Sequence, residues 1–394
     1  MSSMNPSAAS PPRRGLEILD RVRSLHDSIR EASPDIEKSG RLPEGIVTAL
    51  KDANVFGMAM PEAMGGVEAD PITQLAVVEA LSIADGSVGW VAMIGSDGGY
   101  YATHLAPEAA EELYADHNTI TASTLVPRGR ARQVEGGYQV SGHWSFGSAG
   151  LHAEWFGGGC LVVNEDGPAK NEAGHPIVRT MFFPKSGVEI YDNWETTGLA
   201  GSGSNDWSVE DAFVAETHTL SLFEPPRFDT PLFAFPWFIV ANAPGVSLGI
   251  ARAAIDALGE IAAKKVLMPT GTKLQDDLLL QTSVGHAEAE LGAARAYIYD
   301  ATEAIFSSVC AGNEPTIEER AAFRLAGVHA FRASKAIVDR MYEAAGGSSL
   351  YRKSALDRHF RDIATITQHA FAHERVYGEG GRALIGLDPQ SMML

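Results

Sequence analysis

The chain of 394 residues is long enough for two or three layers of core and for more than one domain. Its 50 acidic and 31 basic residues give a formal net charge of −19, which argues against nucleic acid or an anionic membrane as the main partner. Because Cys160 and Cys310 are the only cysteines, we expect a reducing cytoplasm and no disulfide framework. No apolar run approaches the roughly 20 residues that span a bilayer. The polar, Pro-rich stretch 1–15 is expected to be a disordered tail and not a signal peptide.

The first ordered region, residues 15–117, has the periodicity of helices. Apolar side chains at spacings of three and four form one stripe in segment 15–32: Leu16, Ile18, Leu19, Val22, Leu25 and Ile29. The segment 71–85 repeats the pattern behind Pro71, and proline suits the first turn of a helix. We therefore predict an N-terminal helical domain.

The central region, residues 118–224, has the character of short strands. The segment 136–146, "GGYQVSGHWSF", alternates around a Gly-Gly turn. The segments 153–163 and 177–184 are β-branched and aromatic runs bounded by glycine or proline. These features predict a small β domain.

The last region, residues 229–390, returns to long helices. Helical segments are expected at 245–265, 278–309 and 316–347. The third begins with a capping box of Thr316 and Glu319 and ends at a glycine pair. Because the chain has no alternation of strands and helices, a Rossmann fold is not expected. The predicted class is α+β, with a ligand site where the domains meet.

Four stretches, in order along the chain, resemble the acyl-CoA dehydrogenase fold. They are "MPEAMGGVEAD", "ADGSVGWV", "GGYQVSGHWSF" and "AAGGSSLYRKSALDRHFRD", which begin at residues 60, 84, 136 and 344. The resemblance implies an N-terminal helical domain, a central β domain and a C-terminal four-helix bundle. It also implies a homotetramer built from dimers.

One position departs from the common dehydrogenases of that family. Their glutamate base follows the Arg of an Arg-Asp pair by nine residues, and counting from Arg361 gives Ala370, which cannot take a proton. The preceding His369 resembles the pattern of flavin-dependent monooxygenases built on this fold, such as the oxygenase component of p-hydroxyphenylacetate hydroxylase and dibenzothiophene monooxygenase. The segments "WSFGSAG" and "GLAGSGSND" also look more like these enzymes. By that resemblance Ser148 and His369 are the catalytic residues beside the flavin.

The resemblance implies the oxygenase component of a two-component system. A separate NAD(P)H:flavin reductase would supply FMNH2 or FADH2, and O2 would react through a C4a-hydroperoxyflavin. The substrate would be a small aromatic, heteroaromatic or amino-bearing molecule. An imidazole with a pKa near 6.5, as expected for His369, could donate or accept a hydrogen bond at neutral pH. Two alternatives stay open: an acyl-CoA dehydrogenase or flavin oxidase with a displaced base, and a non-catalytic binding subunit.

The resemblance also implies a set of binding residues. Trp144 and Phe146 would pack beside the isoalloxazine. The remaining flavin contacts are expected at Thr121, Ser123, Ser148, Ser202, Ser204, Gly346, Gly347, Ser348 and Arg352, of which the last four suit phosphate. Substrate contacts are expected at Trp90, Tyr101, His104 and His369. The segment 264–279 lacks the Arg-x-x-Phe signature of many FAD-binding relatives, which slightly favours FMN.

A metal site is the competing interpretation of the histidines. The segment 361–374 is expected to be helical, which would place His369 and His373 four residues apart on one face. A third ligand is not evident in the sequence. We therefore expect no metal.

Overall fold

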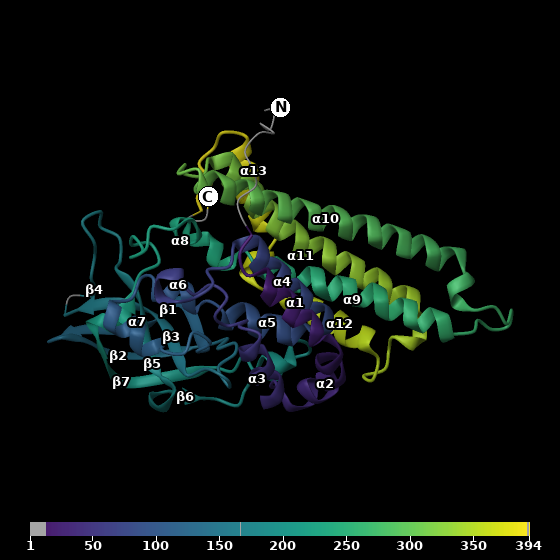
Figure 1. Cartoon of the computed structure of the whole chain (residues 1–394), viewed down its shortest axis with the longest axis horizontal. Coiled ribbons are helices and arrows are strands. Elements are labelled where there is room, and N and C mark those ends of the chain that lie inside the picture. The colour runs from purple at the N-terminus through teal and green to yellow at the C-terminus, as the bar shows by residue number, and fades with distance from the viewer. Residues whose placement is uncertain (1–12, 166, 392–393) are drawn as a thin grey trace.

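The computed structural model describes residues 13–165, 167–391 and 394. The predicted order of helices, sheet and helices is confirmed, and Figure 1 shows the sheet at one end with the long C-terminal helices extending away from it. Most of the predicted tail lies outside the described residues. Its last part is attached to the protein, because the backbone N–H of Arg14 donates to Asp70 at 2.8 Å.

The N-terminal domain is helical. Its helices are α1 (Leu16–Ser24), α2 (His26–Ser39), α3 (Glu44–Asp52), η1 (Glu62–Met64), α4 (Pro71–Ala84), α5 (Gly86–Gly95), α6 (Gly98–Ala102) and α7 (Pro107–Leu113). The predicted single stripe is divided between α1 and α2, which meet at Leu25. Ile18, Val22 and Ile29 are buried as expected, whereas Leu16 is 49% exposed.

Within the described residues, eight strands form one sheet. The strands are β1 (Thr121–Val134), β2 (Gly137–Trp144), β3 (Trp155–Asn164), β4 (Gly167–Pro168), β5 (Val178–Pro184), β6 (Glu189–Ile190), β7 (Trp207–Ala215) and β8 (Thr219–Leu220). Their order is β6-β7-β2-β1-β3-β5-β8, with β4 paired to β3. Among the described strands, β1 and β3 are the one parallel pair, so the chain must cross the start of β1 between β2 and β3.

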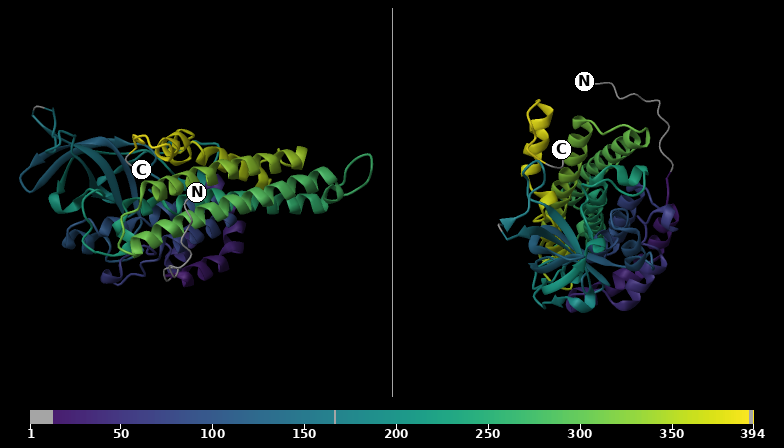
Figure 2. Two further views of the ribbon diagram at one scale, coloured as in Figure 1. Left: turned by 90° about the horizontal axis from the view of Figure 1, so that it is seen from above. Right: turned by 90° about the vertical axis from the view of Figure 1, so that its left-hand side faces the viewer.

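Short 3₁₀ turns connect the strands and lead into the C-terminal helices. They are η2 (Lys185–Gly187), η3 (Ala200–Ser202), η4 (Glu216–His218), η5 (Pro236–Val240), η6 (Leu274–Asp276), η7 (Gly346–Ser348) and η8 (Ala370–Ala372). The helices are α8 (Pro231–Ala234), α9 (Ala243–Lys264), α10 (Leu278–Cys310), α11 (Ile317–Ala345), α12 (Ala355–Ile366) and α13 (Arg375–Leu384). Figure 2 shows α9, α10 and α11 side by side. The predicted capping box of Thr316 and Glu319 is present at the start of α11.

The helix α9 of the C-terminal domain packs against α4 of the N-terminal domain as well as against α11. Contrary to the expectation that no apolar run reaches bilayer length, the segment Pro236–Lys264 is long and apolar enough to cross a bilayer, but 89% of its most apolar part is buried inside the protein. That burial is typical of a core helix. Gly249 lets α9 approach α4, because a Cβ there would lie 2.5 Å from the carbonyl oxygen of Glu79.

Candidate active site

Three side chains from three separate parts of the chain meet at one point. Trp90 comes from α5, Ser148 from the loop after β2, and His369 from the turn after α12. Trp90 Nε1 donates a hydrogen bond to Ser148 Oγ at 2.9 Å. The ring centroids of Trp90 and His369 lie 5.4 Å apart in an edge-on contact. One indole thus joins the two residues that the sequence analysis expected to be catalytic.

The position of Trp90 follows from the way α5 begins. Asp85 precedes this helix, and its carboxylate accepts hydrogen bonds from the backbone N–H groups of Ser87 and Val88. Aspartate is a preferred residue at this position because it satisfies N–H groups that have no partner within the helix. Gly89 then lets α5 pack closely on α4, since a Cβ there would lie 1.8 Å from Ser82 Oγ. Trp90 is 7% exposed as a result of this packing.

The loop that carries Ser148 has an unusual backbone. Phe146 and Ala149 adopt φ angles of 66° and 63°, in the left-handed region that favours glycine. Two backbone hydrogen bonds hold this conformation against a second loop: Gly147 N–H donates to Asn205 O at 2.9 Å and Ala149 N–H donates to Ser202 O at 3.2 Å. Backbone strain of this kind costs on the order of 1–3 kcal/mol per residue and is concentrated at functional sites.

Two further serines lie behind Ser148. Ser148 Oγ and Ser204 Oγ are 2.7 Å apart, and Ser204 Oγ and Ser202 Oγ are 2.8 Å apart. Ser202 and Ser204 are buried, so their hydroxyls contact other protein groups. Their hydrogen bonds in this structure are made with Ser148 and with the chain itself, and their predicted contacts with the flavin stay predictions.

His369 does not lie on a helix, contrary to the sequence analysis. The helix α12 ends at Ile366, and His369 is extended, with φ −65° and ψ 148°. Its Nδ1 accepts a hydrogen bond from the backbone N–H of Phe371 at 3.4 Å. Burial lowers the pKa of His369 to about 4, in place of the expected 6.5, so the imidazole is neutral at pH 7. With Nδ1 as an acceptor, the proton lies on Nε2, which becomes a hydrogen-bond donor.

The two histidines of the segment 361–374 do not share a helical face. His373 lies beyond the short turn η8, is exposed, and accepts a hydrogen bond at Nδ1 from Arg375 N–H at 3.1 Å. Across the described residues, no group of three or more His, Cys, Asp or Glu side chains is arranged to hold a metal ion. The helical geometry on which the metal interpretation rested is therefore absent from the described chain.

The Arg-Asp pair of α12 fixes the loop that contains Ser202 and Ser204. Asp362 accepts a hydrogen bond from the backbone N–H of Leu199 at 2.6 Å, and Arg361 donates to Thr197 O at 2.7 Å. Burial and then the nearby charge of Asp85 raise the pKa of Asp362 to about 7. No local pattern in the sequence indicates this role, because the partners are 163 and 164 residues apart in the chain.

Comparison with known proteins identifies the family. Residues 16–115 match the N-terminal domain of acyl-CoA dehydrogenases and residues 242–374 match their C-terminal domain. The indole-3-acetate monooxygenase of Pseudomonas putida is 31% identical, with 93% of each chain covered. The flavin-dependent monooxygenase oxygenase subunit HsaA of Mycobacterium tuberculosis is 30% identical, with 97% of this chain and 98% of HsaA covered.

The solved structures agree with the sequence relatives. The crystal structure of the HsaA monooxygenase from M. tuberculosis superposes with a TM-score of 0.88 at 28% identity, covering 97% of this chain and all of the other. The chain belongs to the flavin-dependent monooxygenases of the acyl-CoA dehydrogenase fold. It is the oxygenase component of a two-component system that uses reduced flavin and hydroxylates aromatic substrates. Ala370, which is exposed at the start of η8, is consistent with a monooxygenase that needs no dehydrogenase base.

The polar groups of this monooxygenase fit a flavin. The edge of an isoalloxazine ring presents both hydrogen-bond donors and acceptors. The site offers an oxygen with a free lone pair on Ser148 and a neutral N–H donor on His369. Phe146, beside Ser148, is 68% exposed and contacts Trp194 edge-on. An exposed aromatic ring in a strained loop is available to pack against a planar ligand.

Trp144 has a structural position instead. It is completely buried, stacks on Trp207 with ring centroids 4.3 Å apart, and donates from Nε1 to Gly159 O at 2.9 Å. Its ring therefore lies in the core of the β domain, and its predicted place beside the isoalloxazine stays a prediction.

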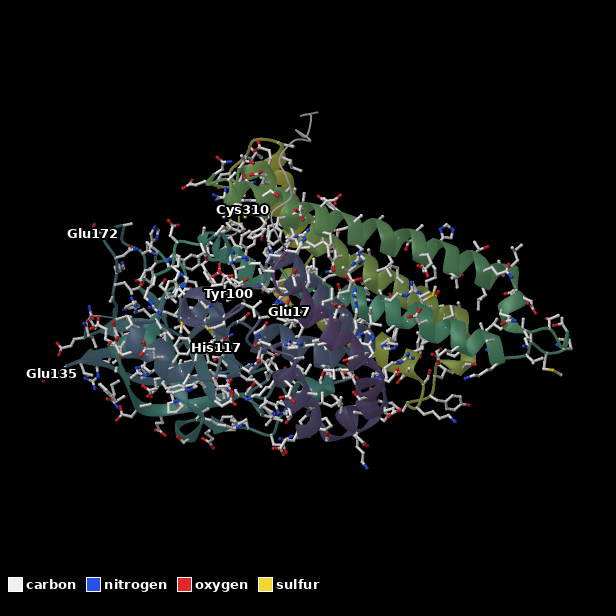
Figure 3. All side chains as sticks on the ribbon, viewed as in Figure 1. Glu17, Tyr100, His117, Glu135, Glu172 and Cys310 are labelled. Carbon is white, nitrogen blue, oxygen red and sulfur yellow. The ribbon has the colours of Figure 1, made fainter. Side chains whose placement is uncertain are left out.

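The remaining predicted contacts near the sheet lie in a separate polar cluster. Thr121 is buried and its hydroxyl is 3.0 Å from Tyr114 Oη. Tyr101 is fully buried and its hydroxyl contacts both Ser123 and Asp97. His104 Nδ1 lies 2.9 Å from the carbonyl oxygen of Tyr100, a buried residue that is labelled in Figure 3.

Burial raises the pKa of Asp97 within this cluster and lowers the pKa of His104. Thr121 and Tyr101 have no exposed surface, and their predicted contacts with the flavin and the substrate stay predictions. Ser123 and His104 are partly buried, and their predicted roles stay predictions.

The predicted phosphate-binding loop follows α11. Gly346 has a φ of 56°, and Lys265 Nζ donates to Ala345 O at 2.8 Å. Arg352 lies 3.5 Å from Glu37 and its side chain is 74% exposed. The binding roles of Gly346, Gly347, Ser348 and Arg352 therefore stay predictions.

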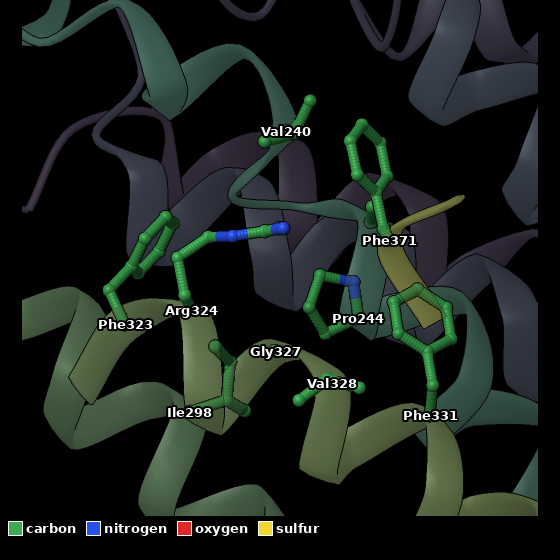
Figure 4. A pocket seen from close by; sticks show the side chains of 10 residues that line it. Val240, Pro244, Ile298, Phe323, Arg324, Gly327, Val328, Phe331 and Phe371 are labelled. Carbon is green, nitrogen blue, oxygen red and sulfur yellow. The ribbon is translucent and has the colours of Figure 1, made fainter. Parts of the chain in front are cut away.

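A small cavity borders Phe371, next to His369. Figure 4 shows the side chain of Arg324 entering it among apolar residues from η5, α9, α10 and α11. The cavity volume is about 20 Å³, which is room for one water molecule. It is too small for a flavin or an aromatic substrate, so it does not mark the substrate site in this structure.

Proposed function

We propose that Ser148 and His369 form the reacting face of the site and that Trp90 holds both in place. The observation that carries this proposal is the position of Trp90, which bonds Ser148 and contacts His369. Bound reduced flavin supplies the electrons that activate O2 for the insertion of one oxygen atom into the substrate. The side chains of Trp90 and Ser148 are more than nine-tenths buried, so they also help to exclude water from the reacting centre.

His369 acts in this proposal as a hydrogen-bond donor and not as a base. Its Nδ1 is committed to the backbone N–H of Phe371. Because burial lowers its pKa to about 4, the ring carries one proton, on Nε2, throughout the neutral range. That N–H can orient an oxygen atom of the substrate or stabilise charge that develops on oxygen.

We infer that the substrate is a small aromatic compound, and that indole-3-acetate is the first to test. The supporting observation is the similarity to indole-3-acetate monooxygenases of Pseudomonas putida and Acinetobacter baumannii, at 31% and 30% identity. The oxygenase component of p-hydroxyphenylacetate 3-hydroxylase of Acinetobacter baumannii, at 24% identity, supports the wider class of aromatic hydroxylation.

The partner is a separate NAD(P)H:flavin reductase, and the proposed assembly is a homotetramer. Relatives that are named as oxygenase subunits or components support the first point. Large apolar side chains that are exposed near both ends of the C-terminal helices support the second: Leu278 (72%), Leu279 (76%), Leu350 (67%), Tyr351 (63%) and Ile385 (74%). Neighbouring pairs such as Leu278 with Leu279 and Leu350 with Tyr351 provide exposed apolar surface of the kind that subunit interfaces use. Light scattering of the purified protein tests the assembly.

We also propose FMN as the preferred flavin and the cytoplasm as the compartment. The first rests on the missing Arg-x-x-Phe signature in segment 264–279. The second rests on Cys160 and Cys310, which are both free. Parallel titrations with reduced FMN and reduced FAD test the first proposal.

The decisive experiment combines the purified protein with a flavin reductase, NADH, FMN or FAD, and indole-3-acetate in the presence of O2. We expect one oxygen atom from labelled O2 in the product, detected by mass spectrometry. The matched control omits the protein and keeps the reductase, which leaves only free reduced flavin. Anaerobic bleaching of a tightly bound oxidised flavin by an acyl-CoA would instead support the dehydrogenase alternative. Failure to bind either redox state would support a non-catalytic subunit.

A further inference from the structure

A continuous chain of hydrogen bonds runs through the site behind Ser148. It begins at Trp90 Nε1, passes through the hydroxyls of Ser148, Ser204 and Ser202, and ends at Leu199 O. The successive distances are 2.9, 2.7, 2.8 and 2.6 Å. All three hydroxyls belong to residues that are 5% exposed or less. Water therefore competes little for these hydrogen bonds.

The two ends of the chain determine the direction of every hydroxyl in it. An indole N–H can only donate, and a backbone carbonyl can only accept. Ser202 must give its one proton to the carbonyl of Leu199, so it accepts from Ser204. Ser204 has then used its proton, so it accepts from Ser148. Ser148 in turn donates to Ser204 and accepts from Trp90. Ser148 Oγ is left with one lone pair that can accept a further hydrogen bond, and it has no proton left to donate.

The last acceptor in this series of hydrogen bonds, the carbonyl of Leu199, is itself held in place. Leu199 has a φ of 50°, in the left-handed region, and its N–H donates to Asp362 at 2.6 Å. Its carbonyl also accepts from Trp194 Nε1 at 3.1 Å. The carbonyl that orients the serines is therefore fixed on both sides of its residue, by the C-terminal helix α12 and by the β domain.

We propose that Ser202 and Ser204 are positioning residues that make Ser148 a pure hydrogen-bond acceptor, and that this acceptor makes the site select reduced over oxidised flavin. The inference rests on the proposed role of Ser148 at the flavin. Reduced flavin carries an N–H at N5, whereas oxidised flavin carries a bare nitrogen with a lone pair there. An acceptor attracts the first and repels the second. A freely rotating hydroxyl would accommodate both, because it could turn its proton toward a bare nitrogen.

Removal of a hydroxyl from the chain is the direct test. In Ser204→Ala, the proton of Ser148 loses its partner and is free to turn. In Ser202→Ala, the proton of Ser204 is freed and can turn toward Ser148. We would measure the dissociation constants of reduced FMN, under anaerobic conditions, and of oxidised FMN for the wild-type protein and each variant. We expect the ratio of the oxidised to the reduced constant to fall about five-fold in both variants, the equivalent of about 1 kcal/mol for one hydrogen bond.

Three matched variants separate orientation from general damage. Ser247→Ala removes another fully buried serine hydroxyl, which donates to Pro244 O at 2.9 Å in α9 and lies outside the chain; its ratio should equal that of the wild type. Ser204→Thr keeps a hydroxyl and should restore the ratio. Trp90→Phe removes the first donor but leaves the carbonyl of Leu199, so it should weaken the binding of both redox states and keep their ratio.

The outcomes are distinct. A ratio that stays within two-fold of the wild type in Ser204→Ala and Ser202→Ala overturns the inference, and so does equal weakening of both redox states. If Ser204→Ala does not fold, the ratio of dissociation constants in Ser202→Ala alone decides whether the inference holds. If the wild-type protein itself binds reduced flavin no more tightly than oxidised flavin, there is no selection to explain and the inference also fails. Failure of the wild type to bind either form would overturn the proposed function instead.

Discussion

Asparagine in place of Asp362 should stabilise the protein by an amount that grows with pH. Burial and then the charge of Asp85 raise the pKa of Asp362 from 3.8 to about 7. A carboxyl whose pKa is raised on folding favours the folded state fully below its unfolded pKa, and this contribution is lost as the pH rises through the folded pKa. The wild-type protein therefore loses stability between about pH 4 and pH 7, at about 1.4 kcal/mol per pH unit.

The size of the stability loss follows from this pH range. The pKa difference of about three units corresponds to a total loss of about 4 kcal/mol, of which about 3 kcal/mol falls between pH 5 and pH 8. The asparagine side chain in Asp362→Asn would keep an oxygen that can accept the N–H of Leu199, and it cannot ionise. Its amide N–H groups could also donate toward Asp85, whose Oδ2 has no hydrogen-bond partner within the described residues.

Urea unfolding followed by tryptophan fluorescence at pH 5 and pH 8 is the assay. The advantage of Asp362→Asn over the wild type should be about 3 kcal/mol larger at pH 8 than at pH 5. The comparison across pH cancels any change in the hydrogen bond to Leu199 that does not depend on pH. Asp35→Asn, on an exposed position of α2, is the control and should show no such change. An equal advantage at both pH values would refute the assignment of a raised pKa to Asp362.

Three further predictions concern the site and the sheet. His369→Ala should lower product formation by on the order of 10²-fold and increase hydrogen peroxide release, whereas His373→Ala should leave both unchanged; equal losses that zinc or iron restores would show a metal site instead. Because burial lowers the pKa of His369 to about 4, its contribution to stability is present above pH 6.5 and is lost as the pH falls through 4, and kcat/KM should show no inflection from this residue between pH 6 and pH 9. An inflection near pH 6.5 that disappears in His369→Gln would contradict that pKa. Trp144→Ala should reduce the free energy of unfolding in urea by about 3–5 kcal/mol, as for other buried aromatic residues, and a loss below about 1 kcal/mol would contradict its place in the core.

Local patterns in the sequence were sufficient to predict the order of helices and strands along the chain. Proline at the start of α4 and the capping box before α11 act through neighbouring backbone groups, so the sequence alone reveals them. The segment 361–374 shows where local patterns fail. It contains neither proline nor glycine, yet the helix ends at Ile366 because Phe371 packs against the core and His369 contacts Trp90. Tertiary contacts of this kind override helix propensity.

The candidate site was only partly predictable for the same reason. Ser148 and His369 were found through motifs, and the structure brings them to one indole ring. The role of Trp90 depends on a hydrogen bond across 58 residues, and that of Asp362 on one across 163. Contacts between residues so far apart in the sequence leave no periodic pattern from which they could be predicted. The contacts of Ser202 with Ser204 and of Trp144 with Trp207 depend on the fold in the same way, because a motif does not show which neighbours its residues will have.

The parallel pairing of β1 and β3 places a geometric limit on how this site can be altered. The segment 145–154 must pass around the start of β1, and the backbone N–H and carbonyl of Ile120 are tied to Glu154 at 2.8 and 3.0 Å at the end of this crossing. The segment joins β2 to β3, which lie on either side of β1, so it must stay long enough to span the width of β1. Deletions in this segment should therefore disrupt strand register before they change specificity. Engineering of the enzyme for new substrates would best keep the length of the crossover fixed and vary its side chains.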